Sequence, residues 1–110
     1  MELKDLTKRA MAIADKYDDL NQTQRGIEWN QQQLMAGLVG DIGDLSKIIM
    51  AKDGFRAMAN VDQKLAHELS DCLWSILVLA NKYNIDLESA FMTTMKELDS
   101  KIDGQLHGSL

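Results

Sequence analysis

The sequence predicts an all-α protein with four helices. Its 110 residues contain no proline and only 7 glycines, so little in the chain interrupts a helix. Apolar side chains recur at alternating steps of three and four residues, the period of a helix with one buried face. A chain of this length forms one hydrophobic core, so we expect a single domain over residues 1–110, built as a four-helix bundle protomer.

The first two helices are predicted from their apolar stripes. Residues 2–19 carry one stripe. The polar stretch over 18–25 has no periodicity and predicts a loop or a frayed link, with helix as the alternative because it contains no proline. The second helix is expected over residues 29–52. It ends where Asp53 and Gly54 follow, because glycine adopts the left-handed conformation that closes many helices.

The third predicted helix, residues 61–83, is apolar on more than one face. Trp74, Leu77 and Val78 lie outside its main stripe, and a monomer of this size cannot cover that much apolar surface. We therefore expect a homodimer, or a homotetramer formed as a dimer of dimers, with this third helix at the interface.

The fourth helix is expected over residues 86–103. Asp86 is suited to cap its N-terminus, and Gly104 is expected to end it. The remaining residues, 104–110, are predicted to form a loose tail.

The charge balance and the single cysteine limit the cellular setting. Seventeen acidic residues against 12 basic ones give a formal charge of -5, which argues against binding a nucleic-acid polymer. Cys72 has no partner for an internal disulfide, and no apolar run is long enough to cross a bilayer. With no signal-like segment at the N-terminus, we expect a cytoplasmic protein without a membrane partner.

Two pairs of acidic residues stand at i, i+3 spacing: Asp41 with Asp44, and Glu68 with Asp71. At about 100° per residue, each pair projects within the apolar arc of its own helix. Burying an unpaired carboxylate costs at least several kcal/mol, so four inward acids need cations, protons or access to water.

Two interpretations of these acids are open. They can pair with lysine or arginine at the bundle edge, but few basic residues lie near them, and Lys47 projects away. Alternatively they hold Mg²⁺ or Mn²⁺, for which oxygen ligands on facing helices are usual, and we favour one or two such ions. A zinc site is disfavoured because His67 projects away from the acids and lacks a second histidine at ligand spacing.

The acidic segments resemble a known family. GLVGDIGDLSK at residues 37–47, followed by ELSDCLW at residues 68–74, is similar to the E-x-x-E and E-x-x-D motifs of the MazG-type all-α nucleoside triphosphate pyrophosphohydrolases. LANKYNIDL at residues 79–87 resembles the family's turn into the last helix. The resemblance extends over residues 29–102.

This resemblance implies an Mg²⁺-dependent enzyme, with Mn²⁺ as another suitable ion. It would hydrolyse a nucleoside or deoxynucleoside triphosphate to the monophosphate and pyrophosphate, and so clear surplus or non-standard nucleotides from the pool. The catalytic and metal-binding residues implied are Asp41, Asp44, Glu68 and Asp71.

The resemblance also implies substrate-binding residues. Trp29, Asn30 and Gln33 resemble the family's aromatic and amide residues ahead of the acidic helix, where an aromatic ring can stack on a base. For Trp29, a hydrophobic staple over the helix start is an equally good interpretation. Lys96 would substitute for a phosphate-binding lysine on the last helix if the register or the chain path there differs from the family's.

Five positions depart from the family pattern and leave a second function open. Asp41 and Asp44 replace glutamates, Gly40 replaces the first acid of a glutamate pair, and Thr94 and Leu98 stand where a lysine and an asparagine are usual. Shorter acids shift a bound ion, and catalysis is sensitive to displacements of about 1 Å. The alternative is a catalytically weakened or inactive module of the same fold that senses nucleotides or binds a protein.

Overall fold

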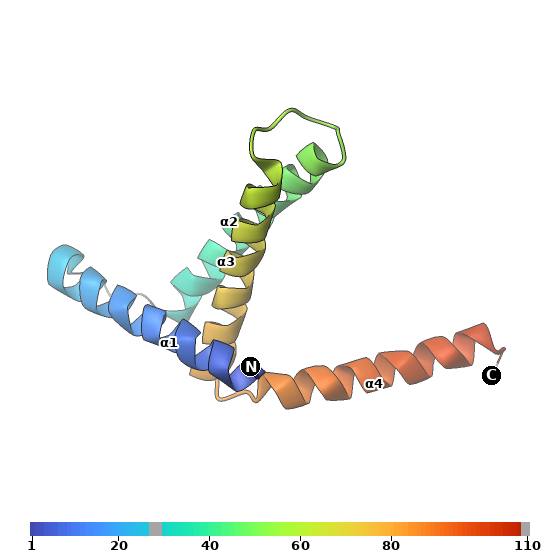
Figure 1. The fold of residues 1–110 in the computed structure, drawn as a ribbon. Helices are drawn as coiled ribbons and strands as arrows, with labels where there is room; N and C mark the ends of the chain where they lie inside the picture. The colour runs from blue at the N-terminus through green and yellow to red at the C-terminus, as the bar shows by residue number, and fades with distance from the viewer. Residues whose placement is uncertain (27–29, 109–110) are drawn as a thin grey trace.

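The computed structural model describes residues 1–26 and 30–108, and over these ranges every regular element is a helix (Figure 1). The α-helices are α1 (Leu3–Leu20), α2 (Gln31–Lys52), α3 (Val61–Lys82) and α4 (Leu87–Leu106). The predicted all-α class is confirmed. Across the described residues, no helix combines the length and the apolar composition that a membrane span requires.

α1 continues into a π-helical turn, η1 (Asn21–Arg25), where the sequence predicted a loop. The hydroxyl of Thr23 donates to the carbonyl of Asp19 at 2.7 Å, and with no proline present the backbone stays helical. Gly26 ends the turn in the left-handed region, at a φ of 62°. This extension of α1 places Asn21 where it is buried against the rest of the fold.

α2 and α3 run antiparallel and side by side as a long hairpin (Figure 1). α2 begins at a capping box in which Asn30 Oδ1 accepts from the Gln33 N–H at 3.0 Å and Gln33 Oε1 accepts from the Asn30 N–H at 2.9 Å. An ion pair between Lys52 and Asp62 spans the connection at the far end of the hairpin.

The core lies where α1 crosses the hairpin. Its buried side chains are small on α1 and branched on the hairpin: Ala10, Ala14, Leu34, Leu77 and Val78. The indole N–H of Trp74 donates to the carbonyl of Ala10 at 3.1 Å, which ties α1 to α3. α1 is therefore held against the half of the hairpin that contains the start of α2 and the end of α3.

α4 does not join the other helices, so a four-helix bundle within one chain is not what the structure shows. It points away from the hairpin (Figure 1), and from Glu88 to Leu106 every residue except Gly104 is exposed. Gly104 also does not end the helix as predicted, because one glycine inside a helix costs only about 1 kcal/mol and the next left-handed residue is Gly108.

Candidate functional site

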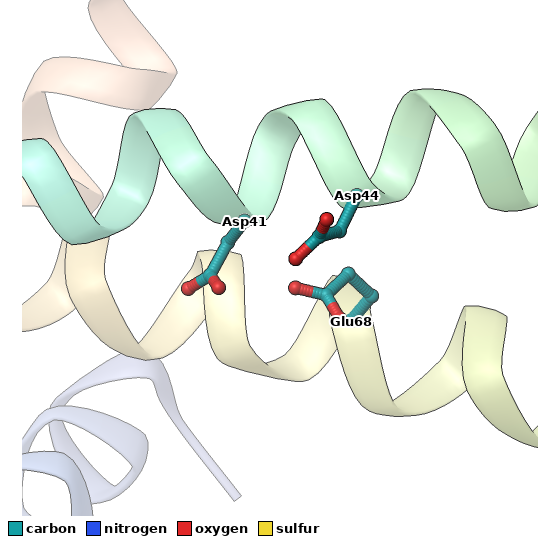
Figure 2. A group of neighbouring side chains, drawn as sticks. All are labelled: Asp41, Asp44 and Glu68. Atoms are coloured by element: carbon teal, nitrogen blue, oxygen red, sulfur yellow. The ribbon is translucent and has the colours of Figure 1, made fainter.

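Three acidic side chains converge between α2 and α3. Asp41 and Asp44 project from α2 and Glu68 from α3, all toward the gap between the helices (Figure 2). One carboxylate oxygen from each lies within 4.8 Å of the others. Within the described ranges, no lysine or arginine forms an ion pair with any of the three. The arrangement matches a set of hard oxygen ligands better than a set of salt bridges.

Helix geometry explains this convergence. Asp41 and Asp44 are one turn apart on α2, so they share a face, and the antiparallel neighbour brings Glu68 opposite them. Asp41 and Glu68 are half-buried, whereas Asp44 is exposed at the edge. The cluster is therefore anchored in the hairpin and open to solvent on one side.

Asp71 lies beside the cluster but outside it. Its Oδ2 is 3.2 Å from Nε2 of His67, one turn earlier on α3. The sequence placed His67 away from the acids, and this contact corrects that expectation: the two side chains are about 40° apart around the helix, close enough to meet. For Asp71, the role of a metal ligand stays a prediction.

Glu68 carries the least satisfied polar atom of the site. Its Oε1 is buried and has no hydrogen-bond partner within the described part of the chain. Burial raises the pKa of Glu68 above its ordinary value. The pKa is raised further by the charge of Asp41 and by a hydrogen bond to Asp41 when Glu68 is protonated. The charges of Asp71 and Asp44 add to the same effect. A buried acceptor among like charges is a position that a cation would stabilise.

The raised pKa makes stability depend on pH. The folded chain favours protonated Glu68, and this preference contributes to the stability of the fold. The contribution is fully present below the ordinary pKa of 4.5 and is lost as the pH rises through the raised pKa of the folded chain. In metal-free buffer near about pH 8, we expect Glu68→Gln to raise the Tm by a few degrees.

This gain should disappear as the pH falls toward about 4, where the wild-type carboxyl is also neutral. Glu97→Gln, at an exposed acid of α4, is the matched control and should melt like the wild type. Thermal melts across the pH range test the expectation. A constant difference at every pH would show that the substitution acts through packing rather than through charge.

A hollow of about 500 Å³ adjoins the cluster on the α1 side. Tyr17 and Trp74 form one wall, with their ring centres 5.9 Å apart in an edge-to-face contact at 65°. Asn21 and Ser70 add polar groups, and the hollow reaches Asp41 and Asp71. Its volume lies in the range of roughly 300 to 1,000 Å³ that is usual for small-molecule sites.

Tyr17 and Asn21 were not predicted as site residues from the sequence. A signal for both was present, since Ala10, Ala14, Tyr17 and Asn21 recur at steps of four, three and four and so lie on one face of α1. What the sequence does not contain is the angle at which α1 crosses α3. That angle places Tyr17 and Asn21, at the end of the stripe, in the wall of the hollow.

A second hollow, of about 450 Å³, lies on the other side of the cluster. Asp44 and Glu68 line it together with Lys47, Lys64 and His67. The sequence placed Lys47 away from the acids, but it borders the same hollow as two of them. The acids therefore stand between an aromatic hollow and one lined by basic side chains. A larger hollow of about 650 Å³, between α1 and the start of α4, contains none of the four predicted acids.

The structure does not bring the other predicted substrate-binding residues to the acids. Asn30 and Gln33 hydrogen-bond to each other's backbone at the start of α2. Asn30 lies about 16 Å from Asp41 along the helix axis. Lys96 is exposed on α4, and Trp29 lies outside the described residues. Their part in substrate binding stays a prediction.

Comparisons with known proteins address the family directly. The model of one protein family, described as MazG nucleotide pyrophosphohydrolase domain, matches residues 29–102, which include α2, α3 and most of α4. The gene 37 protein of Mycobacterium phage L5 is 35% identical over 78 residues, covering 66% of this chain and 68% of the phage protein. No solved structure matches the chain. The predicted family is confirmed: the chain belongs to the MazG nucleotide pyrophosphohydrolase family.

Proposed function

We propose that this chain is a divalent-metal-dependent nucleotide pyrophosphohydrolase. The observation that carries the proposal is the convergence of Asp41, Asp44 and Glu68, together with the buried Oε1 of Glu68, which has no hydrogen-bond partner among the described residues. Mg²⁺ is the expected ion and Mn²⁺ a suitable substitute, because the donor set is entirely carboxylate oxygen. Family membership supplies the reaction class.

The reaction proposed is hydrolysis of a nucleoside or deoxynucleoside triphosphate. Water adds to the phosphoanhydride between the α- and β-phosphates, which gives the monophosphate and pyrophosphate. A divalent ion bound at the cluster would supply positive charge against the triphosphate and would lower the pKa of the attacking water. Asp41, Asp44 and Glu68 would hold it, with Asp71 as a further ligand.

The two hollows suggest how the substrate lies. The nucleoside would enter the hollow walled by Tyr17 and Trp74, where an aromatic ring can contact the base and the Asn21 amide can hydrogen-bond to its edge. The terminal phosphates would extend toward Lys47 and Lys64 on the other side of the acids. This orientation passes the phosphate chain across the cluster.

A turnover assay tests the function. We expect pyrophosphate release from at least one compound in a panel of nucleoside and deoxynucleoside triphosphates with Mg²⁺ or Mn²⁺, and none with EDTA. Nucleotide binding without hydrolysis would favour the sensing module instead. Turnover that appears only after Asp41→Glu and Asp44→Glu restore the family's acids would identify a weakened enzyme, and no turnover in either protein would contradict the proposal.

A further inference from the structure

One basic side chain contacts the acids of the site. Nε2 of His67 lies 3.2 Å from Oδ2 of Asp71, a separation at which an N–H can donate a hydrogen bond to a carboxylate. Over residues 1–26 and 30–108, no other basic side chain forms an ion pair with any of the four predicted acids. An ionised carboxylate only accepts hydrogen bonds, so the donor in this pair is the histidine.

This contact contributes little to the stability of the fold. His67 and Asp71 are one turn apart on α3, and their side chains are 74% and 46% exposed. Exposed pairs of this spacing stabilise a helix only slightly, because water competes for both partners and both side chains lose rotamer freedom. Neither residue belongs to the hydrophobic core. Removing the His67 side chain should therefore leave the folded structure unchanged.

The pair of His67 and Asp71 lies along the rim of the acidic cluster. His67 lines the hollow of about 450 Å³ together with Asp44 and Glu68. Asp71 lines the hollow of about 500 Å³ on the α1 side, together with Asp41. Both members of the pair are therefore neighbours of the cluster, one on each side of it.

Asp71 is close enough to the cluster for its charge to act there. Burial is the largest cause of the raised pKa of Glu68, and the charge of Asp71 adds more to this pKa than the charge of Asp44 does. Asp44 nevertheless belongs to the group of three converging carboxylates and Asp71 does not. A cation among the three carboxylates would also be attracted by Asp71.

A hydrogen bond to one carboxylate oxygen restricts the direction of the other. With Oδ2 of Asp71 held at His67, the carboxylate has less freedom to rotate, and its Oδ1 atom stays available to a cation. Carboxylates that bind metal ions are commonly held by partners of this kind. Removing such a partner typically weakens metal binding by roughly 10- to 100-fold.

We propose that His67 is a positioning residue for the metal site, which holds the Asp71 carboxylate where it can complete the ligand set of a divalent ion at the cluster. This inference rests on the proposed function, because it requires an ion among the carboxylates. His67 itself contacts neither the ion nor the nucleotide. Its effect on metal binding passes through Asp71.

Mn²⁺ binding to the purified full chain without nucleotide tests the proposal, with the free ion measured by its electron paramagnetic resonance signal. We expect His67→Ala to raise the Kd for Mn²⁺ by roughly 10- to 100-fold. His67→Gln should recover most of the affinity, because a glutamine amide can donate to an aspartate one turn later on a helix. His107→Ala, at the other histidine of the chain, is the matched control and should bind Mn²⁺ like the wild type.

A double substitution shows whether His67 acts through Asp71. In the Asp71→Asn background, His67→Ala should cause little further loss of affinity, because the carboxylate that it positions is already absent. Thermal melts in EDTA should give the same Tm for His67→Ala and the wild type. A lower Tm together with an affinity that His67→Gln does not recover would assign His67 a purely structural role and overturn the proposal.

The binding results also separate this proposal from the proposed function. If the wild type binds Mn²⁺ and His67→Ala binds it equally or more tightly, the role of His67 is overturned while the metal site stands. An equal loss of affinity in the wild-type and Asp71→Asn backgrounds would likewise overturn it, because His67 would then act independently of Asp71. A wild type that binds no Mn²⁺ would contradict both proposals.

Discussion

Glu68→Gln is expected to lower kcat for pyrophosphate release by roughly a thousandfold, since a lost ligand in a metal-assisted reaction removes several kcal/mol of transition-state stabilisation. Asp41→Asn should have an effect of the same order. Both substitutions keep the size of the side chain, remove its charge and replace one of its two metal-binding oxygens by an NH2 group. Steady-state assays with Mg²⁺ in excess measure the change.

The control for this experiment is again Glu97→Gln, which removes a carboxylate from the exposed face of α4 and should retain full activity. The comparison is informative because Glu68→Gln is expected to be the more stable protein without metal. A large loss of activity in a variant that melts higher cannot come from unfolding. Activity within about twofold of the wild type would exclude Glu68 from the reaction.

Tyr17→Ala is expected to raise KM by roughly 5- to 150-fold with a smaller change in kcat, because an aromatic contact with a base contributes about 1 to 3 kcal/mol. Tyr17 stands against Trp74 at the wall of the hollow beside Asp41 and Asp71. Its side chain is 52% exposed, so its removal leaves the core intact. Initial rates over a range of nucleotide concentrations separate KM from kcat.

Tyr83→Ala supplies the matched control. Tyr83 is a tyrosine of nearly equal exposure, 56%, at the end of α3 and away from the hollow. It should leave KM unchanged. Equal effects of the two substitutions, or none from Tyr17→Ala, would place the nucleoside elsewhere and leave the metal cluster as the part of the site still supported.

The sequence was most informative where structure is local. The start of α4 at Asp86 follows from capping chemistry, and the i, i+3 spacing of the acids places each pair on one helix face. The bounds of α2 and α3 lie close to those expected, because the apolar period and the residues that break it act within a few positions.

Features that depend on the angles between helices were not predicted. The four-helix bundle assumed that α4 returns to its own hairpin, but the left-handed Asn84 and the cap at Asp86 direct it away. The hollow walled by Tyr17 depends on where α1 crosses α3. His67 was read as facing away because its direction was compared with the cluster as a whole, whereas its partner is Asp71 alone.

The central claim is that the carboxylates between α2 and α3 form a divalent-metal site. The most direct test is a crystal of the wild-type protein grown with Mn²⁺, in which anomalous scattering locates the ion. We expect the strongest peak among the carboxylate oxygens of Asp41, Asp44 and Glu68, and no such peak in crystals of Glu68→Gln. Mn²⁺ bound only at other positions, or no Mn²⁺ in the wild type at millimolar concentration, would contradict the claim.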